Sequence, residues 1–357
     1  MEKLKKHYEE IDSLVRHNSY RIYSAQINLL NSCYQKCVGC RKYEWPSTKL
    51  EFTEVMNIIN ELSEMNCQSL VLSGGEPMKY ERVGDIIEYA NNYNIKVGVL
   101  TSGMFPGNID SNTEYNLNCS NYTQLDKVVK YSDYIAFSYD GATQETFKKC
   151  RGVDCIGMIQ DNIYIVNTRK SRIASKVRLK INMTVSNINY KEMSDVLKIA
   201  QDLQVNECNF FPIHTWNELK INNINIEEMI EEIKKVMIQE TKGKVKTNIQ
   251  TFLSTINRNK PHLCIMPFIH LVIDSDGSVF SCCRLLDDNG DYENRNREAI
   301  LGNVKTMNLN QILQNGNDIR KKLYYANEKV CWQCDRYNSI NEQYFKWLTT
   351  DKEVIFL

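Results

Sequence analysis

SLVLSGGEPMKYERVGDIIEYANNYNIKVGVLTSG, residues 69–103, contains two short apolar runs, and each of them ends in glycine. Apolar runs of this length predict buried strands, and the amphipathic segment between them, residues 81–92, predicts a helix. Two strands joined by a helix are typical of a parallel βαβ unit.

The same alternation extends to both sides of this stretch. We predict further strands at residues 22–30, 133–138, 176–185 and 206–212, and further helices at residues 53–64, 124–131, 156–168 and 190–203. Strand and helix alternate about six times between Arg21 and Pro212, which predicts an α/β fold with a parallel sheet. Periodicity alone leaves open whether that sheet is doubly wound or forms a partial barrel.

The pattern changes after residue 214. Residues 221–257 are polar and predict a helical connector, whereas FIHLVIDSDGSVFSC (residues 268–282) has two apolar runs around a Ser-Asp-Gly turn and predicts a β-hairpin. A last aromatic-rich helix is predicted at residues 340–349. We therefore expect a helical extension (1–20), an α/β domain (21–215), a connector (216–257) and a small α+β domain (258–357).

Composition excludes several classes of protein. The 357 residues are 42% hydrophobic and 25% charged, and 44 Lys and Arg balance 44 Asp and Glu. A zero net charge argues against nucleic acid or an anionic membrane as the main partner. The N-terminus has no apolar signal region and the chain has no long apolar stretch, so we expect a cytoplasmic protein. In that reducing compartment the 13 cysteines predict metal ligands or catalytic thiols rather than disulfides.

Cys33, Cys37 and Cys40 form a Cys-x3-Cys-x2-Cys pattern directly after the first predicted strand. Three thiolates so close in sequence can converge on one metal centre. They are one short of the four that usually hold a [4Fe–4S] cluster, which leaves one iron open to a small molecule. A structural zinc site that takes its fourth ligand from elsewhere is the alternative.

Ser-Gly-Gly-Glu-Pro, residues 73–77, lies at the carboxyl end of the second predicted strand. Ligands bind at this end of the strands in α/β folds, and two glycines let the backbone approach a ligand closely. Taken alone, the motif is more typical of an ordinary turn than of a ligand-binding loop.

Together these motifs resemble the radical S-adenosylmethionine (radical SAM) superfamily, which implies a partial (β/α)6 TIM-like barrel over residues 21–215. The resemblance implies a [4Fe–4S] cluster on the three cysteines and SAM on its open iron. It also assigns SAM contacts to Gly74, Gly75 and Glu76 (amino group), Ser138 (ribose), Arg151 (carboxylate), Asp140 of the same motif, and Asn182.

One position departs from that family. The residue before the third cysteine is usually aromatic and contacts adenine, but here it is Gly39. We therefore expect the adenine contact to come from elsewhere, with residues 209–211 (Asn-Phe-Phe) as the nearest candidates.

Four more cysteines fall in the C-terminal part: Cys264, Cys282, and the pair Cys331 and Cys334. By composition alone, a four-cysteine zinc site and a four-cysteine iron–sulfur site are equally compatible with them. Their spacing resembles the SPASM module in its short "twitch" form, which implies an auxiliary [4Fe–4S] cluster.

Six cysteines remain, and for most of them a small buried side chain is the expected state. Cys208, near the carboxyl end of the sixth predicted strand, is our candidate for donating a hydrogen atom to a substrate radical. Cys150 and Cys283, each beside an assigned site residue, are weaker candidates. His214 is a candidate substrate contact, with an ordinary surface histidine as the alternative.

The resemblance implies an oxidoreductase that reductively cleaves SAM to a 5′-deoxyadenosyl radical and abstracts a substrate hydrogen atom. We expect a ferredoxin or flavodoxin as electron donor. The favoured outcome is cross-linking, dehydrogenation or epimerisation of a ribosomally made peptide or protein. Alternatives are a small polar metabolite such as an aminocyclitol or sugar, a molybdenum-cofactor enzyme (disfavoured by the lack of a glycine-rich tail), and a non-catalytic, zinc-stabilised binding protein.

Overall fold

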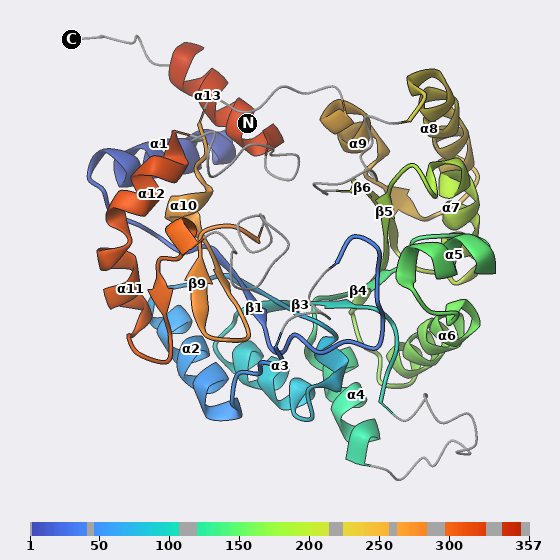
Figure 1. Cartoon of the computed structure of the whole chain (residues 1–357), viewed down its shortest axis with the longest axis horizontal. Coiled ribbons are helices and arrows are strands. Elements are labelled where there is room, and N and C mark those ends of the chain that lie inside the picture. The colour runs from blue at the N-terminus through green and yellow to red at the C-terminus, as the bar shows by residue number, and fades with distance from the viewer. Residues whose placement is uncertain are drawn as a thin grey trace.

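The computed structural model describes residues 2–40, 46–106, 120–213, 224–256, 263–283, 297–325 and 338–350. Within these residues ten strands form one sheet, in the order β10-β9-β8-β1-β2-β3-β4-β5-β6-β7 (Figure 1). The strands are β1 (Ser24–Asn28), β2 (Ser69–Ser73), β3 (Lys96–Thr101), β4 (Tyr134–Ser138), β5 (Arg178–Val185), β6 (Glu207–Pro212), β7 (Lys246–Thr247), β8 (His270–Ile273), β9 (Ser278–Phe280) and β10 (Gly302–Asn303).

Most of the described helices lie on the outer face of this sheet, whereas α13 packs on α1 (Figure 1). The described helices are α1 (Glu2–Arg16), α2 (Phe52–Glu64), α3 (Val83–Asn92), α4 (Ser120–Tyr131), α5 (Gln144–Arg151), α6 (Ile156–Arg172), α7 (Met193–Asp202), α8 (Ile226–Glu240), α9 (Ile249–Ile256), α10 (Met266–Ile269), α11 (Leu309–Asn315), α12 (Asn317–Tyr324) and α13 (Asn338–Thr350). Short 3₁₀ turns span Pro77–Lys79, Tyr190–Glu192 and Arg297–Ala299.

Strands β1 to β6 lie side by side in chain order, and every neighbouring pair among them is parallel. Each is followed by at least one helix, as right-handed βαβ connections require. The partial (β/α)6 barrel expected from the sequence is confirmed. Helix α5 was not predicted, because half of its sequence QETFKKCR is charged and its buried residues are only Phe147, Cys150 and Arg151.

The C-terminal hairpin does not form a separate sheet. Strand β8 pairs in parallel with β1, so that Ser24 lies opposite His270 and Ile27 opposite Ile273. A hydrogen bond of 2.8 Å between Ser24 Oγ and His270 Nδ1 joins the same two strands. The sequence predicts the hairpin, but only the tertiary structure extends the barrel sheet with it.

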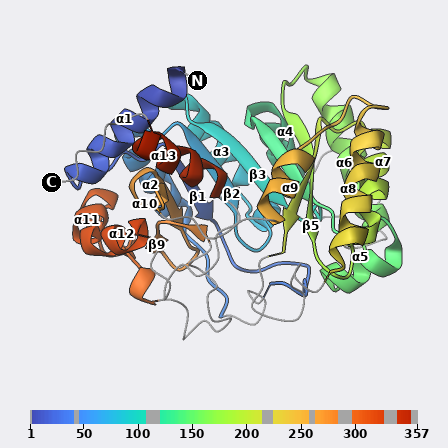
Figure 2. The same cartoon turned by 90° about the horizontal axis from the view of Figure 1, so that it is seen from above.

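The N-terminal helix packs on the C-terminal part of the chain. Tyr8 and Ile11 of α1 share a small apolar core with Phe268, Tyr344 and Trp347. Figures 1 and 2 both place α1 beside α13 and close to α10. The two ends of the described chain are thus joined by apolar burial, which favours association by removing that surface from water. The division into four segments stays a prediction.

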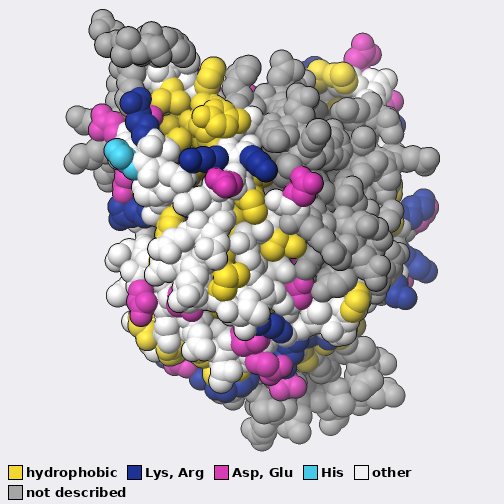
Figure 3. Space-filling model, turned by 60° about the vertical axis from the view of Figure 1, so that its left-hand side comes forward, with side chains coloured by type: hydrophobic (Ala, Val, Ile, Leu, Met, Phe, Trp, Pro, Cys, Tyr) yellow, Lys and Arg dark blue, Asp and Glu magenta, His cyan; other side chains and the backbone are white. Residues whose placement is uncertain are grey.

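The described surface carries charges of both signs. Figure 3 shows Lys and Arg side chains interspersed with Asp and Glu side chains over one face of the molecule. This mixture agrees with the balanced composition of the chain. Among the described helices, none has the length and apolarity that crossing a membrane requires.

Candidate functional site

A cavity of about 620 Å³ opens at the carboxyl ends of the barrel strands. Side chains reach it from the cysteine loop after β1, from the glycine loop after β2, and from the inward faces of β4, β5 and β6. Its lining includes Cys33, Cys37, Cys40, Gly74, Gly75, Ser138, Asp140, Arg151, Asn182, Asn209, Phe210 and Phe211. Segments far apart in the sequence therefore meet in one space.

The cysteine loop is docked on the end of helix α5. Lys36 donates its backbone N–H to the carbonyl of Arg151 (3.2 Å), and Val38 donates to that of Cys150 (3.0 Å). Gly152 ends α5 in the left-handed region at φ 74°, and a Cβ there would lie 2.4 Å from the Lys36 carbonyl oxygen. A glycine is required at this contact because only it combines that φ with so close an approach.

Of the three cysteines of the loop, Cys33 and Cys37 are half-buried, whereas Cys40 is exposed. Burial raises the pKa of the Cys33 thiol and raises that of Cys37 to about 12. These two thiols therefore hold their protons at neutral pH until a metal displaces them. Within the described part of the chain, no three Cys, His, Asp or Glu side chains are gathered closely enough to hold a metal ion. Three thiols lining one cavity nevertheless form a soft donor set that fits iron–sulfur chemistry.

The glycine loop packs against the segment that leads into the cysteine loop. Gly75 donates its N–H to the carbonyl of Leu30 (2.6 Å), and Glu76 donates to that of Ser32 (3.0 Å). A Cβ on Gly74 would lie 2.3 Å from the Leu30 carbonyl oxygen. These glycines thus permit one loop to approach the other, a reason that the sequence did not reveal.

Glu76 is completely buried and its carboxylate is engaged by this chain. It accepts hydrogen bonds from Thr101 Oγ1 (2.7 Å), from the backbone N–H of Ser102 (2.6 Å) and of Met78 (2.9 Å), and from the Ser102 hydroxyl. Burial raises the pKa of this carboxyl, although the four donors oppose the shift. Glu76 therefore ties the glycine loop to the end of β3, while Gly74 and Gly75 line the cavity.

Arg151 and Asp140 form a buried ion pair beside the cysteine loop. Arg151 Nη1 donates to Asp140 Oδ2 at 2.9 Å, and the other carboxylate oxygen accepts from the Thr184 N–H at 2.6 Å. Burial lowers the pKa of Arg151, but the nearby Cys37 and Asp140 raise it by more than burial lowers it. The net shift of the pKa is upward, and the guanidinium stays charged. Its Nε–H is buried without a hydrogen-bond partner. Arg151 lines the cavity, and a buried cation with an unused donor fits the carboxylate of a bound ligand.

A row of small polar side chains crosses three strands at the same level. Ser138 of β4 lies opposite Asn182 of β5, and Asn182 lies opposite Asn209 of β6. Asn209 Nδ2 donates to Asn182 Oδ1 at 3.3 Å. All three side chains line the cavity, where hydroxyl and amide groups are suited to bind a polar ligand such as a ribose.

A family model described as an iron–sulfur cluster-binding domain, SPASM, matches residues 264–335. That segment follows the partial barrel whose cysteine loop has just been described. The chain is a radical SAM protein with a SPASM domain.

Curated relatives of this radical SAM protein are distant. It is 25% identical over 178 residues to the AdoMet-dependent heme synthase of Methanosarcina barkeri, covering 49% of this chain and 46% of the relative. It is 27% identical over 223 residues to a protein of Methanocaldococcus jannaschii named "Probable GTP 3′,8-cyclase", covering 60% of this chain and 66% of the relative. The chain thus spans about half to two thirds of these relatives.

Solved structures share the fold more fully. Streptococcus suis SuiB bound to S-adenosylmethionine aligns with a TM-score of 0.63 at 13% identity, covering 87% of this chain and 70% of SuiB. The protein anSMEcpe with bound AdoMet aligns with a TM-score of 0.61 at 15% identity, covering 88% of this chain and 87% of that one. At such identities the likeness shows the fold alone.

The structure places Cys208 away from the cavity of this radical SAM protein. Its side chain is fully buried in the apolar core, and the residue lies opposite the core residue Ile181. Its neighbour Asn209 points into the cavity, because successive side chains of a strand alternate between faces. The expectation that Cys208 reaches a substrate radical is therefore corrected. Cys150 and Cys283 do line the cavity.

The SPASM cysteines are only partly described. Cys264 is buried, and its N–H donates to the carbonyl of Tyr324 at the end of α12 (2.7 Å). Cys282 packs beside Val272 and Phe280 under the hairpin. The structure does not describe Cys331, Cys334 or His214. The set of four cysteine ligands for the auxiliary cluster therefore stays a prediction from the sequence.

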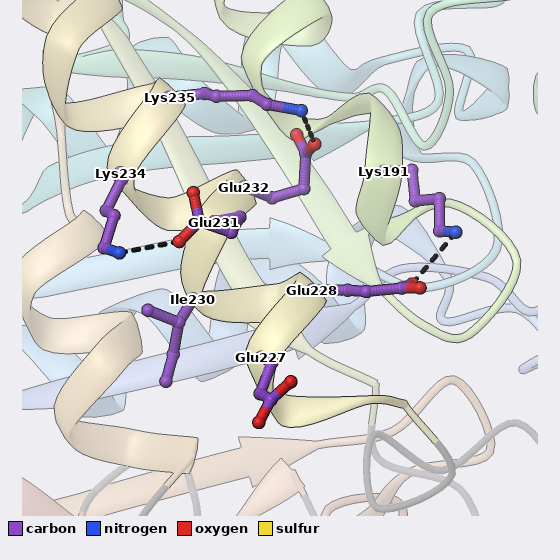
Figure 4. Close-up of a pocket in the computed structure, with 8 residues that line it drawn as sticks. All are labelled: Lys191, Glu227, Glu228, Ile230, Glu231, Glu232, Lys234 and Lys235. Atoms are coloured by element: carbon purple, nitrogen blue, oxygen red, sulfur yellow. Dashed lines mark hydrogen bonds and ion pairs between the residues drawn. The ribbon is translucent and has the colours of Figure 1, made fainter.

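A second hollow lies on the outer side of the barrel, along α8. Six of its charged side chains form three ion pairs: Lys191 with Glu228, Lys234 with Glu231, and Lys235 with Glu232 (Figure 4). This hollow includes no cysteine. It is a charged surface feature rather than part of the site.

Sequence reasoning missed the residues deeper in the cavity. Lys180 and Tyr134 line it, with Lys180 Nζ 4.6 Å from the centre of the Tyr134 ring and 2.7 Å from Glu207 Oε2. Alternation along β5 could have indicated Lys180, because it lies two residues before Asn182 and therefore on the same face. Gln35 was missed as well, because nothing in its local sequence distinguishes a buried amide from an exposed one.

Proposed function

We propose that this chain is a radical SAM enzyme that oxidatively modifies a peptide or protein. The observation that carries the proposal is that Cys33, Cys37 and Cys40 line one cavity together with Arg151, whose buried Nε has no hydrogen-bond partner. The donor set and the buried cation suit, respectively, an iron–sulfur cluster and the carboxylate of SAM.

When bound, a [4Fe–4S] cluster with SAM supplies an electron that cleaves SAM to methionine and a 5′-deoxyadenosyl radical, which abstracts a hydrogen atom from the substrate. The chain's own part is positioning. Arg151, held by Asp140, orients the carboxylate, and Ser138 and Asn182 meet the ribose. Gly74 and Gly75 meet the amino group, and Phe211, on the same strand face as Asn209, stacks on adenine in place of an aromatic residue at Gly39.

A peptide substrate is favoured by the rim of the cavity. Val38 and Phe211 line the cavity and remain 42% and 40% exposed, so they offer apolar contacts at its mouth. Two proteins of the same fold also support a peptide substrate: SuiB has been solved bound to the precursor peptide SuiA, and anSMEcpe with a bound Cp18Cys peptide. Oxidation of the substrate would deliver an electron to an auxiliary cluster on Cys264, Cys282, Cys331 and Cys334, and a ferredoxin or flavodoxin would reduce the first cluster.

A nucleoside triphosphate fits the described cavity less well. Among its described lining residues, the Lys and Arg side chains are Lys180 and Arg151, and each is already paired with a carboxylate. Binding several phosphate charges normally uses unpaired cations or free backbone N–H groups. A small polar metabolite remains the alternative substrate class.

The test is release of 5′-deoxyadenosine from anaerobically reconstituted, reduced protein, with a host lysate separated by size as the substrate source. Stimulation only by the larger fraction supports a peptide or protein substrate, and stimulation by the small-molecule fraction supports a metabolite. Cys33→Ala, Cys37→Ala and Cys40→Ala should each abolish release. Cys67→Ala, at a buried cysteine that does not line the cavity, is the matched control. Zinc in place of iron, with no release of 5′-deoxyadenosine, would establish the binding-protein alternative.

A further inference from the structure

Gln35 is a buried amide in the middle of the cysteine loop, and the partners recorded for its side chain are sulfur atoms. It is 3% exposed and lines the cavity. Its Nε2 donates to Cys155 Sγ at 3.4 Å, and its Oε1 accepts from the Cys37 thiol at 3.7 Å. Its backbone N–H also lies 3.5 Å from Cys33 Sγ.

Such partners are weak for a buried amide. A thiol is both a poor donor and a poor acceptor, whereas burying an amide without good hydrogen bonds is unfavourable. A negatively charged acceptor makes the same N–H bond stronger. The amide is therefore better matched to a thiolate than to the thiols that surround it here.

Cys155 can serve the amide in either of two orientations. It is the N-cap residue directly before α6, three residues after Gly152, and its side chain is buried. Because a thiol has one donor and weak acceptor sites, Cys155 can accept from Nε2 or donate to Oε1. A 180° rotation of the carboxamide exchanges these two atoms without moving the rest of the side chain.

We propose that Gln35 and Cys155 act together as a reversible hydrogen-bond pair that adapts to metal ligation of Cys37. This proposal rests on the proposed function of Cys37 as a cluster ligand. A metal-bound cysteine is a thiolate and can only accept. On ligation the carboxamide of Gln35 turns, Nε2 donates to Cys37 Sγ, and Oε1 accepts from the Cys155 thiol. Both amide groups then keep a partner in either state.

The consequence is that Gln35 changes the reduction potential of the cluster. Hydrogen bonds to the sulfurs are one of the features that set the reduction potential of an iron–sulfur cluster, because they stabilise the more negative, reduced form. Gln35 is thus a positioning residue that makes the cluster easier to reduce. Cys155 supports it from the start of α6, which belongs to the same corner of the fold that docks the cysteine loop.

The test measures the midpoint potential of the SAM-responsive cluster by EPR-monitored reductive titration of the reconstituted full chain, together with its iron content. Gln35→Leu should retain iron but be about tenfold harder to reduce, equivalent to about 59 mV for one electron. Cys155→Ser keeps a group that both donates and accepts, so it should match the wild type. Cys155→Ala should shift the potential in the same direction as Gln35→Leu.

Two results would overturn the proposal that Gln35 and Cys155 exchange donor and acceptor roles. Unchanged potentials in both Gln35→Leu and Cys155→Ala, with loss of iron alone, would mean that the two residues only support the loop. A Cys155→Ser variant that behaves like Cys155→Ala would exclude the exchange of donor and acceptor. Should Gln35→Leu fail to fold, the two Cys155 variants still decide. Absence of any cluster signal in the wild type would instead remove the proposed function itself.

Discussion

Arg151 donates from Nη1 to Oδ2 of Asp140 at 2.9 Å, and both side chains are buried beside the cysteine loop. The pair joins the end of α5 to the end of β4. The same stretch of α5 accepts the backbone hydrogen bonds of the cysteine loop, so one corner of the fold holds both proposed cofactor contacts.

Arg151→Met should weaken SAM binding by about tenfold or more, because it removes a charge-assisted hydrogen bond of about 1.5–3 kcal/mol. Equilibrium dialysis of SAM against anaerobic, iron-loaded protein measures the effect. Lys149→Met changes an exposed cation on the same helix, paired with Glu145, and should leave SAM binding unchanged. Equal losses in both variants would show that α5 acts through its fold rather than through Arg151.

Asp140→Asn should destabilise the protein by about 3–5 kcal/mol, because it leaves the buried Arg151 charge without its counter-ion. Chemical denaturation of the apoprotein measures this cost free of any cofactor. A loss below about 1 kcal/mol, typical of an exposed pair, would contradict the buried geometry.

Gly152→Ala should destabilise the apoprotein by about 1–2 kcal/mol or more, because alanine resists φ 74° and its Cβ would meet the Lys36 carbonyl. The cysteine loop should then hold iron less tightly. Gly157→Ala is the matched control, since a Cβ there has nothing within 4 Å and alanine favours the helix interior. Iron content after reconstitution and desalting separates the two variants, and equal retention would argue against docking through Gly152.

Cys208→Ala should leave substrate turnover and hydrogen-atom transfer intact, because its thiol packs into the core on the face opposite Asn209. Product analysis in deuterated water checks whether the variant still incorporates solvent hydrogen as the wild type does. Cys283→Ala provides the comparison, because Cys283 lines the cavity. Loss of turnover in a stably folded Cys208→Ala protein would restore Cys208 as a donor.

Asp85→Asn should cost about 1 kcal/mol of stability at pH 7, the upper range for a partly exposed ion pair. Burial alone would raise the pKa of Asp85, but hydrogen bonds from Lys127, Arg82 and Gln124 lower it to about 2. A lowered folded-state pKa stabilises the fold above the ordinary value of 3.8, and this contribution is lost as pH falls towards 2.

Urea denaturation of wild type and Asp85→Asn between pH 2 and pH 7 checks the sign of this effect. The free energies of unfolding of the two proteins should become equal near pH 2. The exposed pair of Asp195 and Lys198 provides a control, and Asp195→Asn should change little at any pH. A difference in the free energy of unfolding that grows as pH falls would contradict the lowered pKa of Asp85.

The sequence by itself determined the order of elements and the location of the chemistry. Alternating apolar runs and amphipathic segments are local signals, and β4, β5 and α2 lie within a few residues of their predicted bounds. The cysteine spacing and the Ser-Gly-Gly-Glu-Pro motif are local as well, and both fall at the carboxyl ends of strands, where parallel folds bind ligands.

Only the tertiary structure decided which distant residues meet. The pairing of Ser24 with His270, the tie between Gln35 and Cys155, and the outward direction of Cys208 have no local signature. Helix α5 is also decided this way, because its charged sequence is held by its few buried side chains and by the cysteine loop docked on its end. Periodicity reports how a segment folds, whereas register and packing select its partners, and these are fixed by burial across the whole chain.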